Sequence, residues 1–251
     1  MSTDVVVHAD ARVLAEAVAA RLLVALVDAQ AARGEASVVL TGGELATAVY
    51  QAVAASPAQH AVDWSRVALW WGDERFLPAG DDQRNETAAR AAFGPLLAAA
   101  VVHPMPAADG PDGNDPEAAA ARYARQLAAA GHPARLPHFD VLLLGVGEDG
   151  HVASIFPEQP AAYETRVVCA VRGAPKPPRT RLSLTLPTIN TAEQVWLAAA
   201  GPEKARAVEL AFSGAGPVQV PAAGVAGVDR TLWLLDRAAA AQVRSRLRAL
   251  R

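Results

Sequence analysis

Short apolar runs that end in a glycine turn and lead into a helical pattern recur along this 251-residue chain. In the clearest case the run Ser37–Leu40 meets Thr41–Gly43, and Leu45, Val49 and Val53 then follow at helical spacing. Strands that alternate with helices are typical of a parallel sheet with helices on both faces. The pattern therefore predicts an α/β fold built on a doubly wound, Rossmann-like, mostly parallel sheet flanked by helices.

The rest of the chain continues this alternation. Asp115 is a typical N-cap for a helix that begins at Pro116. The predicted strands are Ser37–Leu40, Arg66–Trp71, Phe139–Leu144, Arg166–Val171, Arg181–Leu184, Val195–Ala199 and Thr231–Leu235. The predicted helices are Ala11–Arg33, a helix through Leu45–Val53, Asn85–Phe93, Pro116–Gly131, Pro202–Phe212 and Arg237–Leu250, with a loop over residues 104–116. No long linker divides the chain, so we expect residues 1–251 to form a single domain.

Composition and charge disfavour several partners. With 23 Lys and Arg against 26 Asp and Glu, the net charge is −3, so the chain lacks the basic field that drives nucleic-acid binding. Cys169 is the only cysteine, which excludes an internal disulfide and fits a reducing compartment. Residues 1–14 do not resemble a signal peptide, and no apolar stretch suits a membrane span. We therefore expect a cytoplasmic protein that binds neither nucleic acid nor membrane; its oligomeric state stays open.

Ligands of open α/β sheets bind at the carboxyl ends of the strands, so the turns after the apolar runs form the candidate site. These turns are Thr41–Gly43, Gly72–Arg75, Gly145–His151 and Gly201 with Lys204. Lys204 lies near the start of a helix, where the dipole favours an anion, although a lone lysine is more often solvated. A basic loop that contains Arg172, Lys176, Arg179 and Arg181 either serves the same anion or is solvated.

Gly145, Gly147 and Gly150 match the pattern G-x-G-x-x-G, which binds a dinucleotide when a strand and a helix flank it. Here Pro157 curtails the helix, and Glu164 precedes the next strand instead of ending it. The glycines instead indicate a tight turn whose backbone N–H groups face an anion or an oxyanion.

Asp149 and His151 lie two residues apart in this turn. A histidine accepts a proton from water at neutral pH, and a neighbouring carboxylate fixes its tautomer and stabilises the imidazolium. The alternative is that Asp149 caps a following helix and His151 is a surface residue of its first turn. Their position behind a central strand favours the general-base interpretation.

Asp73, Glu74 and Arg75 follow an apolar strand that contains two tryptophans. Buried charges are normally paired or bound to a ligand, and the planar guanidinium of Arg75 suits a phosphate or an oxyanion. For Glu74, an internal ion pair that fixes the loop is nearly as well supported as a catalytic role. The sequence contains no G-x-S-x-G elbow and no paired metal-ligand spacing, so covalent and metal catalysis are disfavoured.

Taken together, four segments resemble the 6-phosphogluconolactonase family: Trp71–Pro78, Gly145–Pro157, Arg181–Asn190 and Gly201–Lys204. The resemblance implies a modified doubly wound sheet, similar to that of the glucosamine-6-phosphate deaminases. It also implies cofactor-independent hydrolysis of a sugar-phosphate lactone, 6-phospho-D-glucono-1,5-lactone, to 6-phospho-D-gluconate in the oxidative pentose phosphate pathway.

The resemblance also implies roles for individual residues. His151 would be the general base, Asp73 and Asp149 would orient water, base or sugar hydroxyls, and backbone N–H groups or Arg75 would stabilise the oxyanion. The residues expected to hold the 6-phosphate are Gly42, Gly43, Arg75, Arg179 and Lys204.

One turn departs from the family pattern. The first glycine turn of the family usually continues with Ser-Thr-Pro, whereas Glu44-Leu45-Ala46 follow Gly43 here, so two phosphate-facing hydroxyls are absent and a carboxylate is added.

Two other functions stay open. An amino-sugar-phosphate isomerase or deaminase needs a carboxylate after Asp-Gly-His, for which Glu158 is a poor match; a non-catalytic sugar-phosphate sensor of the kind found in regulators needs a DNA-binding segment that the sequence lacks.

Overall fold

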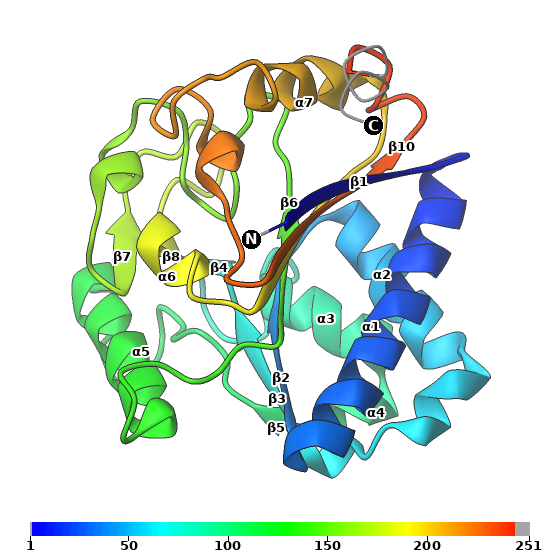
Figure 1. Cartoon of the computed structure of the whole chain (residues 1–251). Coiled ribbons are helices and arrows are strands. Elements are labelled where there is room, and N and C mark those ends of the chain that lie inside the picture. The colour runs from blue at the N-terminus through cyan, green and yellow to red at the C-terminus, as the bar shows by residue number, and fades with distance from the viewer. Residues whose placement is uncertain (1, 244–251) are drawn as a thin grey trace.

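The computed structural model of the chain describes residues 2–243. Its main sheet has seven strands in the order β1-β10-β9-β6-β2-β3-β5 (Figure 1), and neighbouring strands are parallel. The strands are β1 Ser2–His8, β2 Ala36–Leu40, β3 Val67–Trp71, β5 Val101–Val102, β6 Val141–Gly145, β9 Gln194–Ala199 and β10 Arg230–Asp236. The prediction of a doubly wound, mostly parallel α/β fold is confirmed.

Helices cover both faces of this sheet. In Figure 1, α1 to α4 lie on one side of the strands and α5 lies on the other. The helices are α1 Ala11–Arg33, α2 Glu44–Ala55, α3 Asn85–Phe93, α4 Pro95–Ala99, α5 Pro116–Gly131, α6 Leu186–Ile189 and α7 Ala205–Ala211. Short 3-10 helices are η1 Pro57–Ala61, η2 Trp64–Arg66, η3 Pro160–Tyr163, η4 Pro202–Lys204 and η5 Pro221–Gly224. Apolar residues from the sheet and both helical layers share one large hydrophobic core.

A second, three-stranded sheet modifies the doubly wound plan. It consists of β4 Asp73–Arg75, β8 Arg181–Leu184 and β7 Val168–Val171, and both of its strand pairs are antiparallel. The strands predicted at residues 166–171 and 181–184 therefore exist, but they lie outside the parallel sheet. Only Gly72 separates the end of β3 from the start of β4, so this small sheet extends from the carboxyl end of β3. In open α/β sheets, ligands bind at this edge.

Local capping explains why the long first helix was predictable. The backbone N–H of Val13 donates to Asp10 Oδ1 (2.9 Å), and Gly34 ends the helix in the left-handed conformation (φ 81°). At the N-terminus the edge strand β1 was not predicted. At the other end one prediction was wrong, because residues 237–243 form turns instead of a helix; the rest of the predicted helix, to residue 250, lies outside the described residues.

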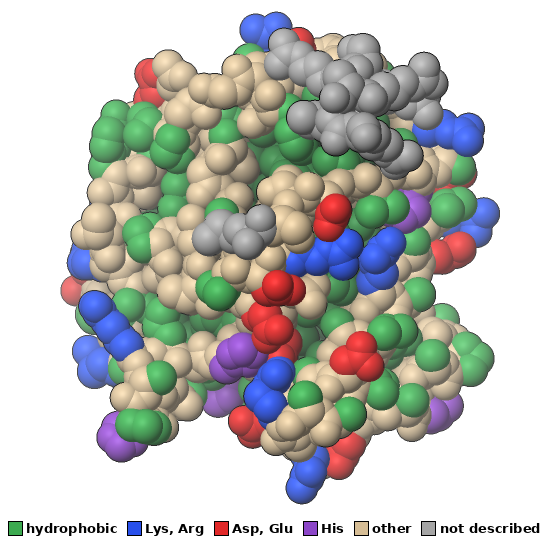
Figure 2. Space-filling view, viewed as in Figure 1, with side chains coloured by type: hydrophobic (Ala, Val, Ile, Leu, Met, Phe, Trp, Pro, Cys, Tyr) green, Lys and Arg blue, Asp and Glu red, His purple; other side chains and the backbone are tan. Residues whose placement is uncertain are grey.

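The molecular surface agrees with the charge balance of the sequence. On the face shown in Figure 2, a group of Lys and Arg side chains near the middle lies directly beside Asp and Glu side chains, so both signs of charge meet there. None of the helices within residues 2–243 is both long and apolar enough to cross a lipid bilayer.

Candidate active site at the carboxyl ends of the strands

A cavity of about 1040 Å³ opens at the carboxyl ends of β2, β3, β6 and β9. All four turns singled out in the sequence contribute to its wall. The predicted site residues that line it are Gly42, Gly43, Asp73, Arg75, Gly145, Gly147, His151 and Lys204. The strand order explains this convergence, because β9, β6, β2 and β3 are consecutive neighbours in the sheet and their carboxyl ends meet at one edge.

His151 and Asp149 form a hydrogen-bonded pair beyond the central strand β6. His151 Nδ1 lies 2.5 Å from Asp149 Oδ1, and the backbone N–H of His151 donates to the same oxygen (3.1 Å). Partial burial raises the pKa of Asp149, but the hydrogen bonds and charge of His151 outweigh it, so the pKa lies below its ordinary value. With Asp149 accepting at Nδ1, the second ring nitrogen, Nε2, is left as the base toward the cavity.

The alternative interpretation of this pair as a helix cap is not supported by the backbone. No α-helix follows Gly150 before α6 begins at Leu186, so Asp149 caps no helix and His151 lies in no first turn. The His151 ring instead packs on Phe156, with ring centroids 4.5 Å apart. Contact with a buried aromatic ring restricts the imidazole to one orientation.

Gly147 makes room for the pair. A Cβ atom at this position would overlap the His151 imidazole and lie 2.6 Å from Asp149 Oδ1. The prediction that the glycine turn offers N–H groups to an oxyanion needs correction. Gly147 N–H donates to the His151 carbonyl (2.9 Å) and Gly150 N–H to the Gly147 carbonyl (3.0 Å), so both donors are consumed within the turn.

Asp73 is held in a buried network under the cavity. Its Oδ2 accepts a hydrogen bond from Ser154 Oγ (2.7 Å), and Asn85 Nδ2 donates to its backbone carbonyl (2.9 Å). The amide of Asn85 also occupies the space where a Cβ of Gly42 would lie, which explains the glycine there. Sequence reasoning missed Asn85 and Ser154, although both lie in or beside the segments that carry the family resemblance.

Glu74 has a structural role, which agrees with the ion-pair alternative. It is fully buried, and it accepts backbone hydrogen bonds from Arg75, Asn85 and Glu86, all at 2.7–2.8 Å, while Arg84 lies 3.7 Å away. Burial raises the pKa of Glu74 to about 7 against the lowering effect of Arg84 and of these N–H groups. The side chain thereby ties β4 to the start of α3.

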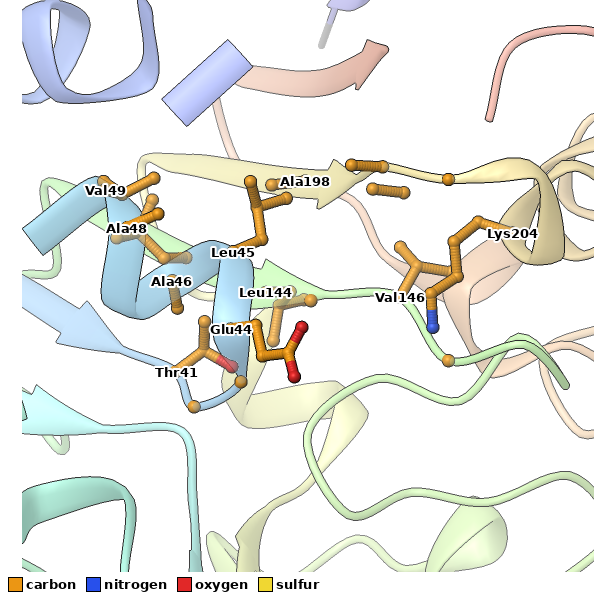
Figure 3. A pocket seen from close by; sticks show the side chains of 18 of the residues that line it. Thr41, Glu44, Leu45, Ala46, Ala48, Val49, Leu144, Val146, Ala198 and Lys204 are labelled. Atoms are coloured by element: carbon orange, nitrogen blue, oxygen red, sulfur yellow. The ribbon is translucent and has the colours of Figure 1, made fainter. Parts of the chain in front are cut away.

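Another part of the cavity wall suits a phosphate. Gly43 is the N-cap of α2 with φ 100°, and no side chain caps this helix, so its first N–H groups point toward the cavity without a side-chain partner. Figure 3 shows Glu44 from the start of α2 and Lys204 from η4 extending toward the same open space. Asp236 accepts from the backbone N–H of Gly201 (3.1 Å) and so fixes the turn that carries Lys204.

One of the two arginines predicted to hold the phosphate, Arg179, lies outside the cavity wall. Arg179 is exposed and does not contribute to the cavity wall, whereas Arg181 is only 6% exposed and does. Arg181 is the buried first residue of β8, whereas Arg179 belongs to the loop before this strand. Arg181 Nε and Nη2 donate to the carbonyls of Pro178 (3.1 Å) and Lys176 (3.0 Å).

A separate group of side chains has the composition of a cation site. His138, Asp140 and Glu193 place ligand atoms within 4.8 Å of one another at the amino ends of β6 and β9, far along the strands from the cavity. Arg33 already forms an ion pair with Asp140. One carboxylate of this cluster is therefore already paired with a cation of the protein.

Residues 9–233 match the family model described as glucosamine-6-phosphate isomerases/6-phosphogluconolactonase. The chain belongs to this family. A 6-phosphogluconolactonase of Streptomyces coelicolor is 59% identical over 96% of this chain and 94% of its own length, and one of Mycobacterium tuberculosis is 47% identical over 98% and 100%.

Solved structures of family members agree with the fold. A 6-phosphogluconolactonase of Trypanosoma brucei superposes with a TM-score of 0.81 at 28% identity, covering 96% of this chain and 99% of that one. A monomeric glucosamine-6-phosphate deaminase has a TM-score of 0.76 at 20% identity, which shows the shared fold alone. The lactonase and deaminase branches must therefore be separated by the site. Glu158, the carboxylate considered for a deaminase, is exposed and does not contribute to the cavity wall.

Proposed function

We propose that this chain hydrolyses 6-phospho-D-glucono-1,5-lactone to 6-phospho-D-gluconate in the oxidative pentose phosphate pathway, with His151 as the general base. The observation that carries the catalytic assignment is the His151–Asp149 pair, with Nδ1 and Oδ1 2.5 Å apart, at the edge of a large cavity behind the central strand. The relatives at 59% and 47% identity, both 6-phosphogluconolactonases, support the substrate.

The reaction follows from this geometry. His151 Nε2 takes one proton from a water whose oxygen attacks C1, and the carbonyl electron pair moves onto the C1 oxygen. When the carbonyl re-forms, the bond from C1 to the ring oxygen breaks, and the proton on His151 passes to that oxygen, which becomes the C5 hydroxyl. The carboxylic acid product then ionises. Asp149 stabilises the imidazolium between the two proton transfers.

The phosphate is assigned to the part of the cavity wall formed by Lys204 and the Gly43 turn. The Lys204 ammonium group has no hydrogen-bond or ion-pair partner within residues 2–243, and Gly43 offers an open turn at the start of α2. Both features favour a dianion. Asp73, held by Ser154, is assigned to orient water or a sugar hydroxyl. No step in this scheme uses a cofactor.

His151→Ala tests the catalytic assignment. We expect lactone hydrolysis to fall by about two to four orders of magnitude, the usual contribution of a general base, with an unchanged thermal melting curve. Spontaneous ring opening must be subtracted, and His60→Ala, which changes an exposed histidine outside the cavity, is the control. Hydrolysis near the wild-type rate would remove His151 from the mechanism, and an inactive wild-type protein that still binds sugar phosphate would favour the sensor.

We also propose that residues 1–251 act as one domain in the cytoplasm. The shared core of the sheet and its helical layers supports a single unit within residues 2–243. The single cysteine supports a reducing compartment.

A further inference from the structure

Two arginines face each other across the small antiparallel sheet. Arg75 of β4 and Arg181 of β8 are paired residues in the ladder, so their side chains leave the sheet on the same side. Like charges in directly opposite positions destabilise a ladder. Both arginines line the cavity, and no ion pair among residues 2–243 neutralises either of them. An anion in the cavity would remove this repulsion.

The two guanidinium groups are fixed in place but keep unused donors. Carbonyl oxygens of the loop before β8 hold Nε and Nη2 of Arg181, and no hydrogen bond within the described chain engages its Nη1. Arg75 Nη1 donates to the Gln83 carbonyl (2.7 Å), while its buried Nε has no partner. Buried N–H donors are normally satisfied, so Arg75 Nε indicates an acceptor that arrives with the ligand, and Arg181 Nη1 is a second donor that is free to bind it.

The cavity then has two separate cationic ends. Arg12 pairs with Glu16 and Lys176 with Glu148, which leaves the arginine pair at one end and Lys204 at the other. Arg75 lies in β4, which continues from β3, and Lys204 lies in the turn after β9. Strands β3 and β9 are three positions apart in the sheet, so their ends are separated by roughly 14 Å. The substrate likewise has two anionic centres in the transition state, the phosphate and the oxygen on C1.

Two observations assign the arginine end to C1. Arg181 and His151 pack on the same ring, since the Arg181 guanidinium carbon lies 5.6 Å and the His151 ring 4.5 Å from the centre of Phe156. The general base and the arginine are therefore at one end of the cavity. Asp73 lies on the same β4 strand and lines the cavity, so its carboxylate would repel a phosphate dianion held there.

We propose that Arg181 is a catalytic residue that, with Arg75, stabilises the negative charge on the C1 oxygen during lactone hydrolysis. This assignment rests on the proposed lactonase function. As water attacks C1 and the carbonyl pair moves onto oxygen, Arg181 Nη1 donates to that oxygen; after ring opening the same donors face the carboxylate of the product. The arginine pair takes the role first predicted for the N–H groups of Gly147 and Gly150, because those two groups are hydrogen-bonded within the turn.

Kinetics on two substrates tests this role. For Arg181→Met and Arg181→Lys we expect kcat to fall by about a hundredfold or more, the usual loss for one oxyanion donor, on both 6-phosphogluconolactone and unphosphorylated gluconolactone. KM for the phosphorylated lactone should stay near the wild-type value. Lysine should restore little, because a single ammonium cannot reproduce the fixed fork. Arg172→Ala, an exposed arginine of the same loop outside the cavity wall, is the control and should keep wild-type kinetics.

Equilibrium binding provides a readout that does not depend on turnover. Wild-type protein should bind 6-phosphogluconate more tightly than sorbitol 6-phosphate, which lacks the C1 carboxylate, and Arg181→Met should lose at least tenfold of that preference while binding sorbitol 6-phosphate as before. Retained binding of sorbitol 6-phosphate also shows that the variant is folded. Equal weakening of both ligands would assign Arg181 to the phosphate, and unchanged kinetics would remove it from the site; either result overturns the proposal. A wild-type protein without lactonase activity would instead refute the proposed function itself.

Discussion

Replacing Gly147 by alanine displaces the catalytic pair without removing any of its groups. The new Cβ would overlap Nδ1 and Cε1 of His151 and lie 2.6 Å from Asp149 Oδ1, whereas ordinary van der Waals contact begins at 3.4 Å. Gly147 and His151 are also tied by a backbone hydrogen bond of 2.9 Å, so the turn cannot widen without breaking it. The imidazole must therefore move by roughly 1 Å or more, a displacement that costs on the order of a hundredfold in rate.

A hundredfold loss corresponds to about 2.7 kcal/mol of transition-state stabilisation. We expect it in kcat for both phosphorylated and unphosphorylated gluconolactone, because the base acts on both, with KM little changed. Initial rates of proton release, corrected for spontaneous hydrolysis, measure it. Gly216→Ala is the control, since a Cβ there meets no atom within 4 Å and the backbone does not need a positive φ. If Gly147→Ala hydrolyses the lactone at more than half the wild-type rate, the argument that the glycine exists to accommodate the pair is refuted.

Three further predictions follow from the same structure. Asp149→Asn should lower kcat by about two to three orders of magnitude in steady-state assays, because the low pKa of Asp149 keeps it ionised at neutral pH and an amide cannot stabilise the imidazolium; full activity would show that the carboxylate is dispensable. Lys204→Ala should raise KM for the phosphorylated lactone and leave kinetics on the unphosphorylated one unchanged; an equal effect on both would place Lys204 outside the phosphate site. Arg166, through its hydrogen bond, lowers the pKa of Glu164 to about 2, so this pair stabilises the fold above pH 4.5 and the contribution disappears as pH falls toward 2. Thermal melts of Arg166→Ala should show a loss of at most about 1 kcal/mol at pH 7 that vanishes near pH 2, because the pair is partly exposed.

Local rules were sufficient for much of the fold. Helix α1 carries its own N-cap and glycine stop, and β6 is an uninterrupted apolar run, so both were predictable from neighbouring residues. Strand β1 was not, because it lies at an edge and pairs only with β10, more than 220 residues later. The separate small sheet was missed for the same reason: β8 has an ordinary strand pattern, and only its pairing with β4 removes it from the parallel sheet.

The same division applies to the site. His151, Asp73 and Lys204 lie in the segments that follow β6, β3 and β9, so the rule that ligands bind at carboxyl ends placed them in one cavity. Arg181 begins a strand and reaches the cavity only through the β4–β8 pairing, so the sequence offered no means of preferring it to Arg179. Asn85 and Ser154 hydrogen-bond to Asp73, although they lie 12 and 81 residues away from it in the sequence. Sequence spacing does not predict such contacts.

The structure changes the role that the sequence predicted for the glycine turn. From the sequence, Gly147 and Gly150 looked like donors to an oxyanion, because glycine-rich turns behind strands often present free N–H groups. In the folded chain those N–H groups close the turn, and the missing Cβ of Gly147 is filled by the base. The paired arginines of the small sheet, by contrast, are cavity residues with donors still unused, which is why we propose them for the oxyanion. In this proposal the small antiparallel sheet supplies the groups that stabilise the oxyanion, and the turn after strand β6 of the parallel sheet supplies the general base.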